Sequence, residues 1–114
     1  MDCPVTNIED VHVAAPMGDL DVAVAPHLRE LFKGMLEGGV KKIVVDMRGV
    51  TFIDSSCLGV LVNAHKLATA NGARIGFAAP STHVKKIFEL TRVDRHLSFF
   101  ASMDEAVLSV SGKQ

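Results

Sequence analysis

The sequence lacks the marks of nucleic-acid-binding, membrane and secreted proteins. Its formal net charge is -1, and its only adjacent cations are the pairs at 41–42 and 85–86, whereas nucleic-acid recognition needs a concentrated basic patch. Apolar runs such as 43–45 and 60–62 are far shorter than the ~20 residues that cross a bilayer. The first residues lack the basic start and apolar core of a signal peptide. We therefore expect a cytoplasmic protein that binds neither nucleic acid nor a membrane.

Residues suited to disulfide or metal chemistry are also scarce. The two cysteines, Cys3 and Cys57, do not occur at metal-ligand spacing, and the five histidines are dispersed along the chain. No Gly-rich phosphate loop follows any of the expected strands. We expect no disulfide framework, no metal and no cofactor.

The proportions of apolar and charged residues in the sequence are those of a folded globular protein. Apolar residues make up 48% and charged residues 22% of the chain, and 114 residues is the usual size of one compact domain. With no Trp and no Tyr, the core must be built from aliphatic side chains and six Phe. We expect a single domain over 1–114, with its core between about 11 and 110. No heptad pattern is present, so a monomer is expected.

Strand-like and helical segments alternate along most of the chain. Apolar residues at spacings of three and four predict helices, and short β-branched or aromatic runs predict strands. Helices are expected from Val22 to Gly38, from Ser55 to Asn71, after Pro80 and after Ser102, and strands at 11–15, 41–47, 74–78 and 97–100. This order predicts an α/β fold with a mixed, mostly parallel sheet, an N-terminal antiparallel hairpin and about four helices.

The stretch from Phe52 to Leu61 is the most informative for function. Asp54, Ser55 and Ser56 follow an apolar strand and are residue types that favour the start of a helix. At a helix start the backbone N–H groups lack intrahelical partners and the macrodipole is positive, so a phosphate added to a hydroxyl there is stabilised locally. The same two serines also fit a purely structural role as helix caps.

This stretch also carries a resemblance to a known family. Asp54-Ser55-Ser56, followed after one residue by Leu58-Gly59, resembles the signature of STAS domains, and in particular of the stand-alone anti-sigma factor antagonists. Gly18-Asp19-Leu20-Asp21 resembles the turn before that family's first helix, and Leu28-Arg29 lies on the helix that follows. The resemblance extends from about Val11 to Val110, and it implies a STAS-like fold.

The resemblance implies a phosphorylation-controlled binding switch in transcription rather than an enzyme. It implies that Ser55 is phosphorylated by an anti-sigma factor that is itself an ATP-dependent serine kinase. The unmodified antagonist would bind that kinase and so release a sigma factor, the phosphorylated form would not, and a cognate phosphatase would reset the switch. Asp21 would help to engage the kinase, and Asp54 would flank the acceptor.

An apolar shoulder on the helix after Ser55 extends the predicted partner-binding surface. Helical spacing places Leu58 and Val62 on one flank of this helix, beside a polar strip at Asn63 and Lys66. These two apolar side chains either pack under a neighbouring element or form part of the surface that a partner covers. The residues expected to bind the partner are Asp21, Asp54, Ser56, Leu58 and Val62.

Cys57 departs from the family pattern, which usually has Gly at this position. Cysteine suits a helix at least as well as glycine does, but its side chain could crowd a partner that approaches closely. A thiol at a helix start also fits a redox sensor, although most such cysteines fill the core.

Two other interpretations stay open. A STAS subunit of another complex, such as a stress-signalling scaffold or an accessory protein of a lipid-transport ATPase, would share the fold without phosphorylation of Ser55. A small serine hydrolase that uses Ser55 is less favoured. Its nucleophile elbow needs glycine two residues before and two residues after the serine, and Ile53 and Cys57 stand there.

Overall fold

The structure is a computed structural model that describes residues 3–112; residues 1–2 and 113–114 lie outside this range. Its strands are β1 (Val5–Ile8), β2 (Val11–Ala14), β3 (Gly18–Leu20), β4 (Lys42–Asp46), β5 (Val50–Ile53), β6 (Arg74–Ala78) and β7 (Phe99–Phe100). Its helices are α1 (Ala25–Glu37), α2 (Ser55–Ala70), α3 (Thr82–Leu90) and α4 (Met103–Ser111), with a 3-10 turn at Val93–Arg95. The single domain over 1–114 stays a prediction.

The main sheet has the mixed topology that the sequence predicts. Five strands lie in the order β1-β2-β4-β6-β7. The first two form an antiparallel hairpin, and the pairs β2–β4, β4–β6 and β6–β7 are parallel. Parallel neighbours need crossover connections, and helices α1 and α2 provide such connections. The predicted α/β class, mostly parallel sheet, N-terminal hairpin and four helices are confirmed for the described residues.

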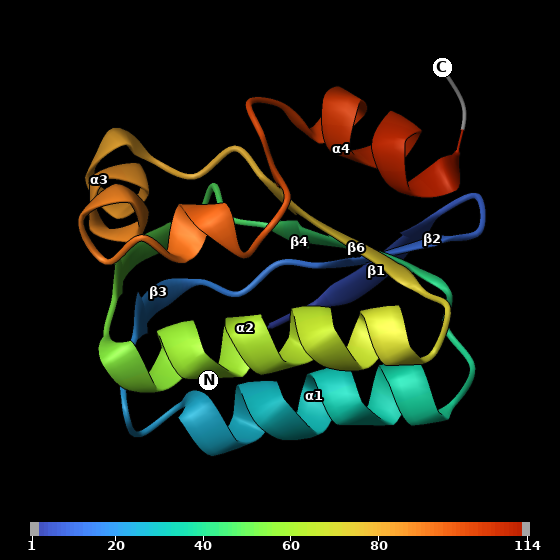
Figure 1. The fold of residues 1–114 in the computed structure, drawn as a ribbon, viewed down its shortest axis with the longest axis horizontal. Coiled ribbons are helices and arrows are strands. Elements are labelled where there is room, and N and C mark those ends of the chain that lie inside the picture. Colours follow the sequence, from blue (N-terminus) through green and yellow to red (C-terminus); the bar gives the residue numbers. More distant parts are fainter. Residues whose placement is uncertain (1–2, 113–114) are drawn as a thin grey trace.

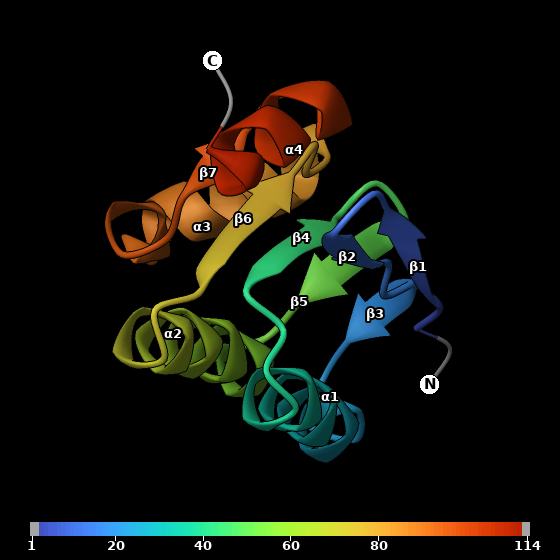
Figure 2. The same ribbon diagram turned by 90° about the vertical axis from the view of Figure 1, so that its right-hand side faces the viewer.

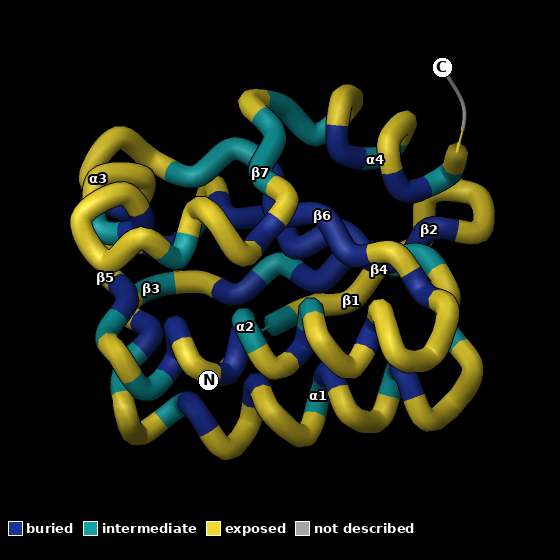
Figure 3. Tube along the Cα trace, viewed as in Figure 1, coloured by how far each residue is buried: buried dark blue, intermediate teal, exposed yellow. Residues whose placement is uncertain are grey.

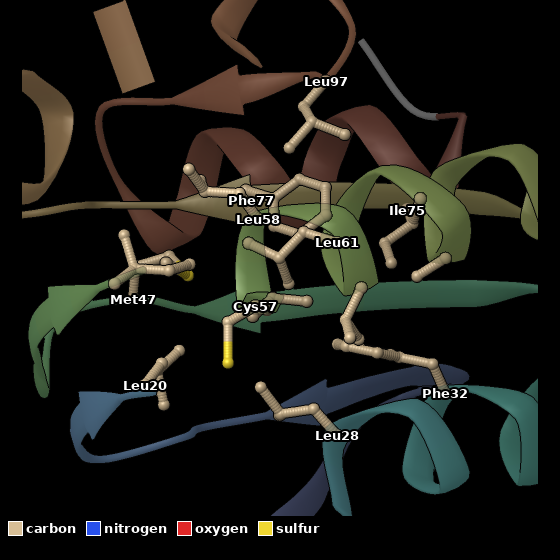
Figure 4. Packing of buried hydrophobic residues seen from close by; sticks show 14 of the residues in the cluster. Leu20, Leu28, Phe32, Met47, Cys57, Leu58, Leu61, Ile75, Phe77 and Leu97 are labelled. Carbon is tan, nitrogen blue, oxygen red and sulfur yellow. The ribbon is translucent and has the colours of Figure 1, made fainter. Parts of the chain in front are cut away.

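The helices cover the sheet in two layers. Helices α1 and α2 lie side by side on one face, and α4 lies on the opposite face (Figures 1 and 2). The larger core lies beneath α1 and α2, where Phe32, Phe77 and Phe88 are almost fully buried. A smaller core that includes Val44 and Val110 lies beneath α4. Buried segments accordingly follow the sheet and the inner faces of the helices in Figure 3, and part of the larger core is enlarged in Figure 4.

A second, two-stranded sheet corrects the expectation for residues 18–21. The sequence predicts a turn there, but Gly18–Leu20 forms strand β3, which pairs in parallel with β5. Only Asp21, after the strand, takes part in a turn: its backbone oxygen accepts hydrogen bonds from the amides of Val24 and Ala25, both at 3.1 Å. Because this turn precedes the helix, α1 begins at Ala25 and not at Val22.

In the C-terminal half the predicted helices α3 and α4 are present, and the last predicted strand is shorter than expected. Helices α3 and α4 begin where the caps predict, since the Ser81 hydroxyl accepts from the Val84 amide and the Ser102 hydroxyl accepts from the Glu105 amide, both at 3.2 Å. The strand expected at 97–100 is reduced to Phe99–Phe100. The residues before it instead form the 3-10 turn, which the sequence does not predict.

Candidate functional site

Asp54 fixes the point where strand β5 becomes helix α2. Its backbone is extended (φ -100°, ψ 178°), and its side chain caps the helix by accepting a hydrogen bond from the Cys57 amide at 3.1 Å. Its own amide donates to the Leu20 oxygen at the end of β3, at 3.0 Å. Asp54 therefore ties the start of α2 to the segment that leads into Asp21.

Ser55 is the first residue of α2, and its side chain is free. The residue is exposed, and its hydroxyl makes no hydrogen bond to any residue in the range 3–112. The amides of Ser55 and Ser56 likewise have no acceptor among the described residues, whereas the next amide, that of Cys57, is bound by Asp54. A hydroxyl thus stands in solvent beside two unpaired N–H groups at the positive end of a 16-residue helix.

The turn at Asp21 packs against this helix start. The Cys57 thiol donates a hydrogen bond to the Asp21 backbone oxygen at 3.3 Å, across 36 positions of sequence. The Asp21 carboxylate accepts from the Ala23 amide at 3.0 Å, which orders the turn itself. The structure therefore brings Asp21 close to the helix start that carries Asp54 and Ser55, the arrangement that the family resemblance implies.

Cys57 is hydrogen-bonded to both acidic residues, through its amide to Asp54 and through its thiol to Asp21. Its side chain has no exposed surface, and Figure 4 shows it among the buried side chains of the larger core. Burial, together with the nearby carboxylates of Asp54 and Asp21, raises the pKa of its thiol from 9.0 to about 11. The thiol is therefore protonated at neutral pH, which argues against a reactive redox sensor. The concern that Cys57 crowds a partner does not hold, because the side chain points inward.

The apolar shoulder is only partly present. Leu58 is 5% exposed and belongs to the larger core, so the expectation that its side chain meets a partner is wrong. Other parts of the fold cover this flank of α2 at Leu58, but they do not fully cover it at Val62. Val62 is half-buried, with part of its side chain packed on the core, and Ser56 is also half-buried. These two retain surface that a partner can contact.

Sequence reasoning missed two exposed apolar side chains that adjoin the site in sequence. Val22, which the sequence assigns to a helix, lies in the turn after Asp21 and is 69% exposed. Phe52, two residues before Asp54, is 41% exposed because β5 pairs with β3 and not within the main sheet. No local signal reveals the exposure of Phe52, since it depends on that strand pairing.

Metal-ligand clusters, a Ser–His pair at Ser55 and membrane-spanning helices can each be checked in the described part of the chain. In the range 3–112, no three His, Cys, Asp or Glu residues lie close enough to hold a metal ion. Ser55 makes no hydrogen bond to a histidine, so this part of the chain contains no Ser–His pair of the hydrolase kind at that serine. Of the helices described, none combines the length and the apolar composition that crossing a bilayer requires.

Comparisons with known proteins find relatives that are named as anti-sigma factor antagonists. A Thermotoga maritima protein, named as a proposed anti-sigma factor antagonist, is 29% identical over 111 residues, which cover 96% of this chain and 98% of that protein. The anti-sigma-B factor antagonist of Staphylococcus aureus is 31% identical over 74 residues, 65% of this chain and 68% of that protein.

Solved structures show the same fold. The crystal structure of the Thermotoga maritima protein is 28% identical and superposes with a TM-score of 0.88, covering 96% of this chain and 94% of that one. The anti-sigma factor antagonist SpoIIAA in its unphosphorylated form, at 21% identity and a TM-score of 0.74, covers 97% and 99% and shares the fold. The family model of the STAS domain matches residues 3–106. This chain therefore belongs to the STAS domain family.

Proposed function

We propose that this protein is an anti-sigma factor antagonist whose binding is controlled by phosphorylation of Ser55. Unmodified, it binds an anti-sigma factor that is an ATP-dependent serine kinase, and so releases a sigma factor. Phosphorylation of Ser55 ends that binding, and a phosphatase restores it. Membership of the STAS family and the names of the relatives from Thermotoga and Staphylococcus support the antagonist role.

The observation that carries the proposal is the free, exposed hydroxyl of Ser55 at the start of α2. A kinase needs an acceptor that it can reach, and this hydroxyl has no hydrogen-bond partner among residues 3–112 to give up. The product is also tolerated in the free protein, because the unpaired amides of Ser55 and Ser56 can donate to a phosphate and the helix dipole favours an anion there. Phosphorylation is therefore expected to leave the fold intact.

The same phosphate opposes binding inside an interface. A phosphoserine carries a charge of about -2, and Asp54 and the Asp21 turn lie beside it. A partner that is complementary to two carboxylates and a neutral hydroxyl must then accept two further negative charges in a desolvated site. Like-charge juxtaposition across an interface costs several kcal/mol, so we expect affinity to fall by about a hundredfold or more.

The surface around Ser55 supplies the other contacts. We assign partner contacts to Asp21, Asp54, Ser56 and Val62, while Leu58 supports the helix from the core. Val62→Asp places a charge on the half-buried flank of α2 and is expected to abolish binding. Thermal unfolding of the same variant checks that the fold survives. A Val62→Asp variant that stays folded and binds as the wild type does would remove Val62 from the surface.

The test is a titration of the unmodified and the phosphorylated protein with each purified anti-sigma serine kinase encoded in the same genome. We expect one kinase to bind the unmodified form, and the Ser55-phosphorylated form to bind about a hundredfold less tightly. Circular dichroism and thermal unfolding of the two forms should agree. The proposal is overturned if no such kinase binds the unmodified protein, or if both forms bind one kinase equally.

A further inference from the structure

Gly59 lies on the exposed face of α2, one turn after Ser55. Ser55, Gly59 and Asn63 recur at a spacing of four, which places them along the same face of the helix, and all three residues are exposed. This face points away from the core, whose side of the helix carries the buried Cys57 and Leu61. A partner that reaches Ser55 from solvent therefore meets Gly59 next.

The fold itself does not require glycine at this position. A Cβ atom built on Gly59 has no other atom within 4 Å, and Gly59 is not among the glycines with positive φ. Gly76 differs, because a Cβ there would lie 2.9 Å from a ring carbon of Phe100. Glycine in a helix interior destabilises the helix relative to alanine. Gly59 thus weakens α2 without any gain in packing within the chain.

A shallow groove of about 110 Å³ continues this face between α1 and α2. Asn63 and the 37% exposed Leu67 line it from α2, and Arg29 and Lys33 line it from α1 above an apolar floor. Neither cation forms an ion pair within residues 3–112. The groove therefore combines apolar surface with two positive charges that nothing in the described chain neutralises.

We propose that the anti-sigma factor lays a carboxylate-bearing segment along α2, from Ser55 across Gly59 and into the α1–α2 groove. The missing side chain of Gly59 lets the partner approach the helix at backbone distance. Arg29 and Lys33 then bind acidic side chains of that segment. The inference rests on the proposed function and specifies the surface by which the same partner is recognised.

Gly34 offers a matched control for the close approach. It is also an exposed glycine in a helix interior, nothing lies within 4 Å of a Cβ built on it, and it does not line the groove. Gly59→Ala and Gly34→Ala should both raise the Tm, by about 4 °C. Only Gly59→Ala should weaken binding of the kinase, by about tenfold, and Gly59→Gln should weaken it further while Gly34→Gln does not.

Lys86 of α3 is the control for the charges. It is exposed and does not line the groove, so Lys86→Glu and Lys33→Glu change the net charge equally. Lys33→Glu should weaken kinase binding about tenfold at low salt, with a smaller effect at 0.5 M salt, and Lys86→Glu should leave it unchanged. Arg29→Glu should act as Lys33→Glu does.

The outcomes separate this inference from the function on which it rests. The probe is the kinase that binds the unmodified wild type, and Ser55→Asp is measured alongside. If Ser55→Asp loses binding while Gly59→Ala and Lys33→Glu bind as tightly as Gly34→Ala and Lys86→Glu do, the docking path is wrong and the proposed function stands. If no anti-sigma serine kinase binds the wild type, both are wrong.

Discussion

In the described part of the chain, α2, α3 and α4 each begin beside a serine, and among Ser55, Ser81 and Ser102 only Ser55 has a hydroxyl without a hydrogen bond. Ser81 and Ser102 occupy the cap positions of α3 and α4, and each hydroxyl accepts an amide hydrogen bond three residues on. At α2 the carboxylate of Asp54 takes the cap position, and Ser55 stands one residue later, exposed and unbonded. Because Asp54 caps α2, the Ser55 hydroxyl is not needed as a cap and is available for modification.

The first turns of α2 and α4 also differ in the number of acidic residues that they carry. Helix α4 carries Asp104 and Glu105 in its first turn, which already oppose the positive end of its dipole. Helix α2 has no acidic residue in its first turn and is longer, at 16 residues against 9. Within the first turn itself, a phosphate at the start of α2 thus meets no acidic residue, and the nearest carboxylate is that of the capping Asp54.

The largest effect is expected from a charge placed on the free serine. Ser55→Asp should weaken binding of the cognate kinase by about a hundredfold, since it introduces a carboxylate beside Asp54 at the interface. Ser102→Asp adds the same charge at a cap position that aspartate fits well, so it should leave binding unchanged. Titration calorimetry measures both. Equal affinities for the two variants would contradict the distinction between the helix starts.

We expect the stability to depend on pH because the third residue of α2, Cys57, has a buried thiol that can ionise. The third residues of α3 and α4 are Val84 and Glu105. Burial and the carboxylates of Asp54 and Asp21 hold the pKa of the Cys57 thiol at about 11 in the folded chain, against 9.0 for an ordinary cysteine thiol. Between these values the unfolded chain loses the proton and the folded chain keeps it. Stability is therefore lost as pH rises through this window, by at most ~1.4 kcal/mol per pH unit.

Urea unfolding at several values between pH 7.5 and 10.5 measures this loss, with Cys57→Ser as the control because its hydroxyl does not ionise. The difference in the free energy of unfolding between wild type and Cys57→Ser should change with pH above about 9. Two parallel pH profiles would show that the thiol is not buried as described.

A smaller effect, on the free energy of unfolding, is expected from the two serines that cap helices, Ser81 and Ser102. Ser81→Ala and Ser102→Ala each remove a cap hydrogen bond, so each should lower the free energy of unfolding by about 1 kcal/mol. Phosphorylation of Ser55 should be unaffected in both variants. Denaturant unfolding gives the stabilities, and kinase assays give the rates. A Ser102→Ala variant as stable as the wild type would show that its cap contributes nothing.

The smallest effect is expected from Ser55→Ala. The Ser55 hydroxyl has no intramolecular partner among residues 3–112, so its removal should change the free energy of unfolding by less than about 0.5 kcal/mol. The variant should nevertheless be blocked for phosphorylation. A loss of about 1 kcal/mol, as expected for Ser81→Ala, would mean that Ser55 is a structural cap after all.

Local signals in the sequence predict the helix starts well. The residues that begin α2, α3 and α4 form caps or first turns through contacts no more than three residues apart, and such contacts depend only on neighbouring residue types. The β-branched run that forms β4 is likewise recognisable from the sequence. The predicted proximity of Asp21 to Ser55 came from the family resemblance and not from such local patterns.

Features that depend on distant partners were not predicted. Strand β3 exists because residues 18–20 pair with 50–53, and that pairing also leaves Phe52 exposed. Leu58 and Val62 look equivalent by helical spacing, yet only Leu58 is fully covered, because burial depends on which elements pack against each part of α2. Neither outcome is encoded in a window of neighbouring residues.

The central claim is that the Ser55 hydroxyl, freed by the Asp54 cap, is the acceptor of the phosphoryl group. Incubation of the protein with its cognate kinase and ATP, followed by mass spectrometry of the modified peptide, tests it directly. The account predicts one phosphoryl group, on Ser55, and none in Ser55→Ala. Phosphate on Ser56, Ser81 or Ser102, or incorporation that persists in Ser55→Ala, would contradict it.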